Sequence, residues 1–134
     1  MIVERDDTMP VHSSEDVVRV RQEVRTRAIA IGFSLVDQTK IVTAASEIAR
    51  NTLDYGGGGT LRIETLRNGV RSGLRLIFTD RGPGIADIKL ALTDGYSSGT
   101  GLGLGLSGAK RLSTEFDIQS RAGEGTIVTL ARWK

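Results

Sequence analysis

The chain reads Asp94-GYSSGTGLGLGLS-Gly108 just before a segment with helical character. Six of the fourteen residues from Gly95 to Gly108 are glycines. No packed core needs that density, because glycine loses more backbone entropy on ordering than other residues and adds no side chain. Unobstructed backbone amides in front of a helix N-terminus are typical of phosphate-binding sites. Glycine-rich runs also serve as flexible links, so the meaning of this one depends on the rest of the chain.

Length and composition predict one domain, residues 1–134, that is large enough for a hydrophobic core. The chain has no cysteine, which excludes disulfides and thiolate metal sites. Its formal net charge is only +2, which argues against nucleic acid as a partner. No stretch approaches the roughly 18 consecutive apolar residues of a membrane span, and the N-terminus lacks a signal-peptide pattern. We therefore expect a cytoplasmic protein without a membrane or nucleic-acid partner.

Residues 1–13 form a mixed, variable N-terminal segment that allows a short edge strand, either in 1–5 or near Val11. Ser13 or Ser14 can then cap a first helix, because either hydroxyl can accept a hydrogen bond from the first turn. Apolar residues recur at helical spacing along this helix, at Val17, Val20, Val24, Ala28 and Ile31. We expect its arginines on the solvated face, namely Arg19, Arg21, Arg25 and Arg27.

A second helix is predicted to begin at Ser34, since Asp37 follows three residues later as in a capping box. Its apolar face consists mostly of alanines, and it ends in the turn 56–59. Beyond it, alternation and turn residues predict two strand pairs with helical segments between them. The strands are expected in 61–67, 74–79, 116–121 and 126–133, and the helices in 85–92 and 107–115. Asn68-Gly69 is the hairpin signal of the first pair.

This order of elements predicts an α+β fold, a two-layer sandwich in which helices pack on one face of a mixed, mainly antiparallel sheet. The second helix carries two polar residues beside its small apolar ones, Glu47 and Asn51. They are four residues apart and share one side of the helix, where they could supply a base and a magnesium ligand. The alternative is a polar pair that faces solvent.

Two further motifs follow strands. Asp80-Arg-Gly82-Pro-Gly84 could accept a hydrogen bond from an exocyclic amine such as that of adenine and let a flat ring approach the turn, or it could be an ordinary turn. Gly123-Glu-Gly125 is typical of a hairpin, and the hydroxyl of Thr126 after it could reach the same base as Asp80.

In this order the four motifs resemble the Bergerat ATP-binding fold that gyrase-type ATPases, Hsp90 chaperones, histidine kinases and MutL proteins share. The resemblance covers residues 14–133 and implies ATP and Mg²⁺ as cofactors. It implies that Glu47 orients or deprotonates the attacking hydroxyl and that Asn51 holds magnesium. The implied nucleotide-binding residues are Asn51, Asp80, Gly82, Gly84 and Thr126, with a lid over the phosphates formed by Gly99, Gly101, Gly103 and Gly105.

The branch of this superfamily is indicated by what the sequence lacks. His12 is the one histidine, and it lies in no dimerisation helix, which argues against a sensor histidine kinase. No further domains are expected. A stand-alone kinase domain is typical of the bacterial anti-sigma and switch-kinase branch, which phosphorylates STAS-domain proteins on Ser or Thr. The segments that resemble RsbT-type switch kinases of the stressosome are 37–41, 47–51 with Tyr55-Gly56, 94–97, 108–112 and 131–133.

The chain departs from this pattern at Leu104 and Ser107 in the lid, and in its longer N-terminus. The resemblance implies STAS-domain substrates and, after their phosphorylation, binding of a PP2C-type phosphatase. Two alternatives stay open. One is an anti-sigma factor kinase that sequesters a sigma factor, and the other is a non-catalytic ATP-binding adaptor, which the intact Glu47 disfavours.

Overall fold

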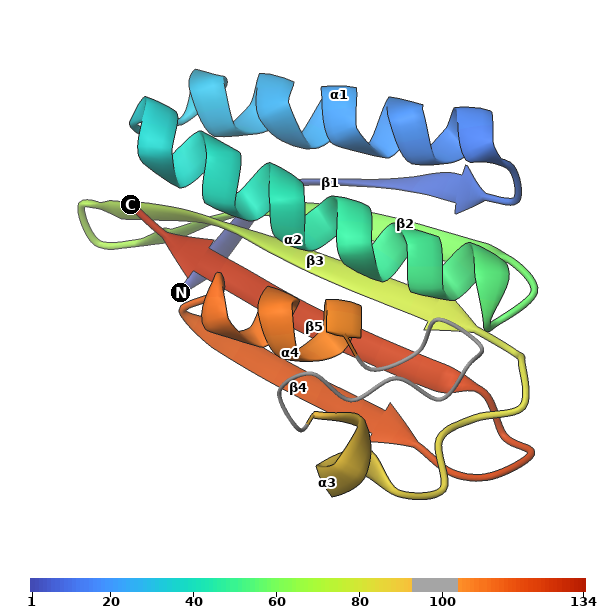
Figure 1. Cartoon of the computed structure of the whole chain (residues 1–134). Helices are drawn as coiled ribbons and strands as arrows, with labels where there is room; N and C mark the ends of the chain where they lie inside the picture. The colour runs from blue at the N-terminus through green and yellow to red at the C-terminus, as the bar shows by residue number, and fades with distance from the viewer. Residues whose placement is uncertain (93–103) are drawn as a thin grey trace.

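The structure is a computed structural model that describes residues 1–92 and 104–134 (Figure 1). Five strands form one sheet in the order β1-β2-β3-β5-β4, and each of the four pairings is antiparallel. The strands are β1 (Ile2–Val11), β2 (Gly59–Asn68), β3 (Arg71–Asp80), β4 (Glu115–Ser120) and β5 (Thr126–Trp133). The helices are α1 (Ser14–Ala30), α2 (Leu35–Asp54), α3 (Ile88–Ala91) and α4 (Leu104–Arg111).

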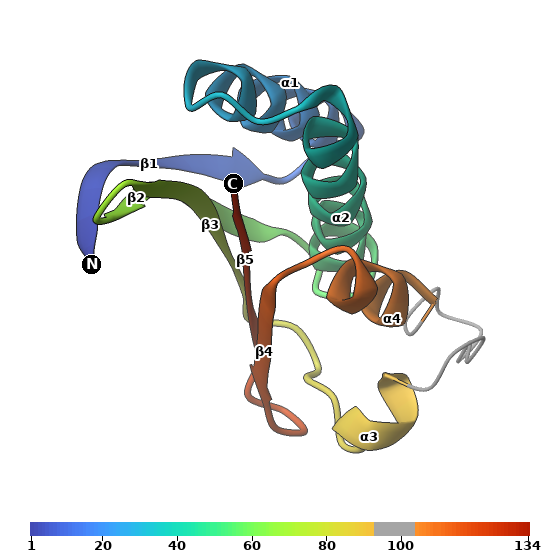
Figure 2. The same ribbon diagram turned by 90° about the vertical axis from the view of Figure 1, so that its left-hand side faces the viewer.

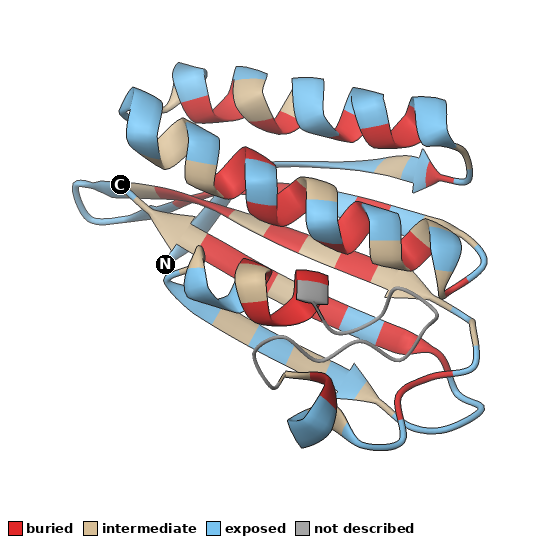
Figure 3. Cartoon of the chain, viewed as in Figure 1, coloured by how far each residue is buried: buried red, intermediate tan, exposed pale blue. Residues whose placement is uncertain are grey.

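The helices lie on one face of the sheet, as the view along its edge shows (Figure 2). The predicted α+β two-layer sandwich is therefore confirmed. The core fills the space between the layers, with alternate residues of β2, β3 and β5 facing α2 (Figure 3). Leu74, Leu76 and Phe78 of β3 are at most 1% exposed. None of the helices in the described ranges is long and apolar enough to span a bilayer.

The predicted starts of both long helices are confirmed. The hydroxyl of Ser13 accepts from the backbone N–H of Asp16, and that of Ser34 accepts from the N–H of Asp37, both at 3.1 Å. The first hairpin is also as expected, although its two-residue loop is Gly69-Val70. Gly69 has φ 64°, the left-handed backbone that a two-residue hairpin loop requires at its first position.

Three expectations about element positions were wrong. The N-terminal strand is ten residues long, because almost all of it pairs with β2. Helix α4 begins at Leu104 and ends at Arg111, earlier than the predicted 107–115. It ends early because the chain already joins the sheet at Thr114, whose backbone N–H donates to the carbonyl of Ala131 at 2.8 Å. The predicted short helix in 85–92 is reduced to α3.

The expectation that Arg27 lies on the solvated face of α1 was also wrong, since this side chain is only 5% exposed. Arg27 follows Val20 by seven residues, two helical turns, so it lies on the buried stripe. Its burial is tolerated because it pairs with two carboxylates, Glu23 on the same helix (2.9 Å) and Asp7 on β1. The ion pair with Asp7 joins α1 to the edge of the sheet.

Arg132 of β5 joins two helices that are distant in sequence. Its Nη2 donates to Oδ1 of Asp37 near the start of α2 at 2.8 Å, and its Nη1 donates to the carbonyl of Leu112 just after α4 at 2.9 Å. A cation near the C-terminal carbonyls of a helix is favourable there. The guanidinium therefore ties the start of α2 to the chain at the end of α4.

We predict that this tie contributes to acid sensitivity. The hydrogen bond from Arg132 holds the pKa of Asp37 below its ordinary value. A lowered pKa in the folded state means that the unfolded chain binds the proton more readily, so the stabilisation is present above about pH 4 and is lost as the pH falls further. Urea unfolding should show wild type more stable than Asp37→Asn at neutral pH, with the gap closing in acid. If the difference in free energy of unfolding between wild type and Asp37→Asn does not change with pH, the proposed contribution of the Arg132–Asp37 pair is contradicted.

Candidate functional site

An inner cavity lies where α2 and α4 meet the ends of β3 and β5. Its polar lining residues are Asn51, Thr52, Tyr55, Asp80 and Thr126, and its apolar ones are Ile48, Phe78, Ile85, Leu106 and Val128. Three sequence-predicted site residues, Asn51, Asp80 and Thr126, therefore share one cavity. Asp80 and Thr126 are direct cross-strand partners in the register of β3 and β5.

Asp80 is the last residue of β3, and its carboxylate is partly satisfied by the protein itself. The backbone N–H of Gly82 donates to its Oδ1 at 2.9 Å. Burial nevertheless raises the pKa of Asp80, although the backbone N–H groups of Gly82 and Thr126 act in the opposite direction. A half-buried carboxylate of this kind has remaining acceptor capacity for a donor on a ligand, such as an amine.

The glycines of the Asp80 turn are required by packing within the chain. Gly84 has φ 74°, and a side chain there would overlap the carbonyl oxygen of Arg121. A Cβ on Gly82 would lie 2.7 Å from the Cα of Gly56, and a Cβ on Gly56 would in turn overlap the carboxyl of Asp80. Neither Gly82 nor Gly84 lines the inner cavity. The structure thus gives these glycines a reason other than the predicted approach of a flat ring.

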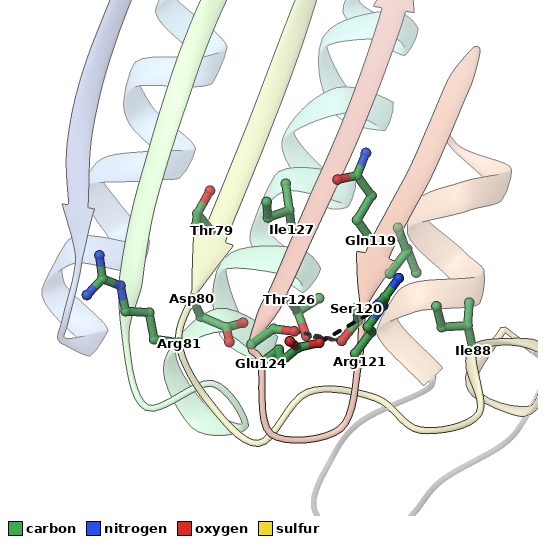
Figure 4. A pocket seen from close by; sticks show the side chains of 12 residues that line it. Thr79, Asp80, Arg81, Ile88, Gln119, Ser120, Arg121, Glu124, Thr126 and Ile127 are labelled. Atoms are coloured by element: carbon green, nitrogen blue, oxygen red, sulfur yellow. Dashed lines mark hydrogen bonds and ion pairs between the residues drawn. The ribbon is translucent and has the colours of Figure 1, made fainter.

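Ser120 organises the Thr126 side of the site, and sequence reasoning did not single it out. Its hydroxyl accepts from the backbone N–H of Ile85 at 2.8 Å and donates to the carbonyl of Gly125 at 2.8 Å. The same hydroxyl lies 2.8 Å from Oγ1 of Thr126 (Figure 4). A serine hydroxyl has only one proton to donate, and Ser120 donates it to the carbonyl of Gly125. In the contact between the two hydroxyls, Thr126 is therefore the donor and Ser120 the acceptor. The remaining lone pairs of Thr126 are left as acceptors. The only signal in the sequence was the position of Ser120 at the end of a strand.

Tyr55 also joins the site from outside the predicted set. Its hydroxyl donates to the carbonyl of Gly84 at 2.9 Å and so links the end of α2 to the Asp80 turn. Gly56, the first residue of the predicted turn 56–59, packs tightly between Asp80 and Gly82.

Glu47 and Asn51 lie beside Gly105 of α4. A Cβ built on Gly105 would be 2.9 Å from Oε2 of Glu47 and 3.2 Å from Nδ2 of Asn51. That Nδ2 is buried and has no hydrogen-bond partner in the described part of the chain. Buried amides are normally paired, so this one is available to a ligand, and rotation of the amide would present its oxygen instead. Gly105 is the one predicted lid glycine that the structure describes, because Gly99, Gly101 and Gly103 lie outside the described residues.

A second, larger hollow of about 640 Å³ opens at the same end of the sheet (Figure 4). It shares Asp80 and Thr126 with the inner cavity. However, the larger hollow is also lined by Thr79 and Ile127. These two residues alternate along their strands with buried core residues and so face away from the helices.

The inner cavity measures only about 10 Å³, the space of a single water molecule. We assign the ligand site to it in spite of its size, because the unpaired amide of Asn51 lines it and does not line the larger hollow. A nucleotide base can then enter only if side chains that line the cavity rearrange.

Comparison with known proteins agrees with this geometry. Residues 36–134 match the family described as histidine kinase-, DNA gyrase B-, and HSP90-like ATPase. The chain belongs to this ATPase family. Over 118 residues it is 47% identical to the serine/threonine-protein kinase RsbT of Bacillus subtilis (strain 168), which covers 88% of this chain and 89% of RsbT. The predicted resemblance to RsbT-type kinases and the predicted enzyme class, protein serine/threonine kinase, are confirmed.

Two solved structures share the fold. One contains the RsbU and RsbW domains of a Mycobacterium tuberculosis protein, with a TM-score of 0.66 and 23% identity over 96% of this chain. Our chain spans 32% of that longer chain. The other is the histidine kinase domain of a blue-light-activated histidine kinase from Erythrobacter litoralis, with a TM-score of 0.54, 16% identity, and coverage of 92% and 61% of the two chains. At these identities the likeness shows the fold alone.

The contact of Gly105 with Glu47 and Asn51 predicts a site-specific effect of one methyl group. Gly105→Ala should lower the rate of phosphoryl transfer at least about tenfold, or about 1.4 kcal/mol, because the new Cβ displaces the two side chains. Gly108→Ala is the matched control, since it lies in the same helix and its Cβ would meet nothing within 4 Å. Both variants gain the same helix propensity. Equal activity of the two variants in a kinase assay would contradict the prediction.

Proposed function

We propose that this chain is a single kinase domain that uses Mg-ATP to phosphorylate Ser or Thr on STAS-domain partner proteins in a cytoplasmic, bacterial partner-switching pathway of the stressosome type. We further propose that, once released from its phosphorylated partner, it binds a PP2C-type phosphatase. The observation that carries the proposal is the 47% identity to RsbT over nearly all of both chains. The convergence of Asn51, Asp80 and Thr126 on one cavity supports it.

Phosphoryl transfer depends mainly on positioning and on neutralising charge. In the proposed mechanism the carboxylate of Asp80 accepts a hydrogen bond from the adenine amine. Thr126, which lies opposite Asp80 in the sheet, completes the wall of the base site. The turn at Gly82 and Gly84 holds the Asp80 carboxylate in place through the N–H of Gly82. The cavity has to widen before the base can bind, because it measures only about 10 Å³.

Asn51 is the residue proposed to bind Mg²⁺, through its side-chain oxygen. In residues 1–92 and 104–134 no three His, Asp or Glu side chains are grouped so that they could hold a metal ion. A single protein oxygen fits Mg²⁺, which commonly takes its other ligands from phosphates and water. The buried side-chain amide of Asn51, whose Nδ2 has no hydrogen-bond partner in the described residues, can supply this one oxygen ligand. When bound, the ion would neutralise charge on the phosphates.

Glu47 is the proposed catalytic residue. It lies one turn from Asn51 along α2, beside Gly105, and its side chain is exposed and thus accessible to a protein substrate. Its carboxylate would orient the attacking Ser or Thr hydroxyl and accept its proton. The backbone amides of Gly99, Gly101, Gly103 and Gly105 are proposed to bind the β- and γ-phosphates in front of α4.

Asp80→Asn tests the base site. We expect ATP binding, measured by calorimetry, to weaken about 100-fold, because a charge-assisted hydrogen bond is lost. We also expect no loss of stability at neutral pH. Burial raises the pKa of Asp80, so its ionised form is less favourable in the folded chain than in the unfolded one, and a neutral amide removes that cost. A variant that unfolds more readily and still binds ATP would overturn this assignment.

Glu47→Ala tests the chemistry separately from binding. When the wild-type chain is incubated with labelled ATP and candidate STAS-domain proteins, a Ser or Thr of one of these proteins should become labelled. The variant should bind ATP nearly as well and transfer about 100-fold less phosphate. Undiminished labelling by Glu47→Ala would sink the proposed role. If the wild-type chain labels no STAS-domain protein and a sigma factor co-purifies with it instead, the anti-sigma alternative replaces the proposal. If the chain binds ATP but neither labels a protein nor binds a sigma factor, the remaining alternative is a non-catalytic ATP-binding adaptor.

A further inference from the structure

A groove runs along the outward side of the two long helices, away from the inner cavity. It measures about 270 Å³ and is lined by Val18, Arg21, Gln22, Arg25 and Val42. None of these residues lines the inner cavity or the larger hollow beside it. Helices α1 and α2 run antiparallel side by side above the sheet, and their outward surfaces are exposed (Figures 1 and 3). The groove is therefore a surface that the nucleotide site does not use.

Exposed apolar side chains extend the groove along both helices. Val18 is 50% exposed, and Ile29, eleven residues or three turns later on α1, is 56% exposed. Leu35 is 71% exposed and precedes Val42 by two turns, so it lies on the same side of α2 as the groove. Large apolar side chains that gather at one exposed surface mark an interaction site more often than isolated ones do. Val18, Ile29, Leu35 and the groove residues together are called the α1–α2 stripe below.

The arginines of the two helices differ in whether they have a partner. Three of the five bind carboxylates: Arg19 binds Asp16, Arg27 binds Asp7 and Glu23, and Arg50 binds Asp54. The other two, Arg21 and Arg25, have no carboxylate within 4.0 Å in the described part of the chain, and both line the groove. They are one turn apart on α1. The stripe thus presents two unneutralised positive charges between apolar side chains.

The charge and the shape of the α1–α2 stripe together indicate what kind of partner it binds. A second copy is disfavoured, because a two-fold dimer would bring the same patch together and place Arg21 and Arg25 against their own copies. Two adjacent helices form the kind of groove that an amphipathic helix fills, with anchors spaced one turn apart. Such a helix would need apolar anchors for Val18, Ile29 and Leu35 and carboxylates for the two arginines. We propose that the α1–α2 stripe binds an acidic amphipathic helix of a protein partner.

The position of the stripe in the chain supports a role other than ATP chemistry. The ATPase family match covers residues 36–134, and every stripe residue except Val42 lies before it. No stripe residue lines the inner cavity or the larger hollow. Binding at the stripe should accordingly be measurable without ATP, so the proposal can fail or hold independently of the proposed kinase activity.

The test uses a fluorescein-labelled amphipathic peptide with leucines along one face and glutamates along the other, titrated with the whole chain at low salt. We expect the Arg21→Ala/Arg25→Ala double variant to bind it about tenfold more weakly than wild type, and added salt to weaken the wild-type complex. Arg19→Ala is the matched control, because Arg19 lies on the same helix but is paired with Asp16 and does not line the groove. The control should bind as wild type does.

Backbone amide shifts on peptide addition should be confined to α1 and α2. The proposal is overturned if the peptide does not bind, if the double variant binds as well as wild type, or if the shifts map elsewhere. It is also overturned if the chain dimerises through the stripe, which sedimentation would show as a wild-type dimer that the stripe variant Leu35→Asp abolishes.

Discussion

The close approach of α2 to the sheet is the constraint on which the site depends. The face of α2 toward the sheet includes Ala44, Ala45 and Ala49, all fully buried, so the helix axis can lie nearer to β3 than larger side chains would permit. This distance brings Asn51 to the cavity that Asp80 lines. It also leaves so little room beyond the helix that position 56 must be glycine to clear the Asp80 carboxyl. A bulkier face on α2 would separate the amide from the carboxylate.

Local signals in the sequence predicted the parts of the fold that depend on neighbouring residues. Ser34 caps α2 through a hydrogen bond to a residue three positions away, and the Asn68-Gly69 signal placed the first hairpin within one residue. Arg27 was misassigned because its environment is decided by Asp7, twenty residues away on a strand whose length the mixed N-terminal sequence did not reveal. Burial of a charge is predictable only when its partner is known.

In the candidate site, too, the sequence predicted the residues that belong to local motifs but not those whose roles depend on distant contacts. Asn51, Asp80 and Thr126 were identified from motifs, and the structure brings them together. Ser120 and Gly56 were not identified, because their parts arise from contacts between segments far apart in the sequence. The structure also changes the reason for Gly84, whose backbone is set by the carbonyl of Arg121 rather than by room for a ligand. Motif order thus predicted which residues meet, while the contacts that hold them required the assembled sheet.

The strand order has a consequence for synthesis. Strand β5 follows β4 in the sequence but lies between β3 and β4 in the sheet. When the ribosome has made residues 1–120, Asp80 therefore pairs with Gly59 of β2 but lacks its partner Thr126 on β5. Strand β4 has no partner strand yet, and Arg132 is not yet present to tie α2 to α4. The nascent chain can form the β1–β2–β3 part with its two long helices, because those elements contact one another directly. The candidate site has to wait for the strand that carries Thr126, so it can be completed only after β5 has been made.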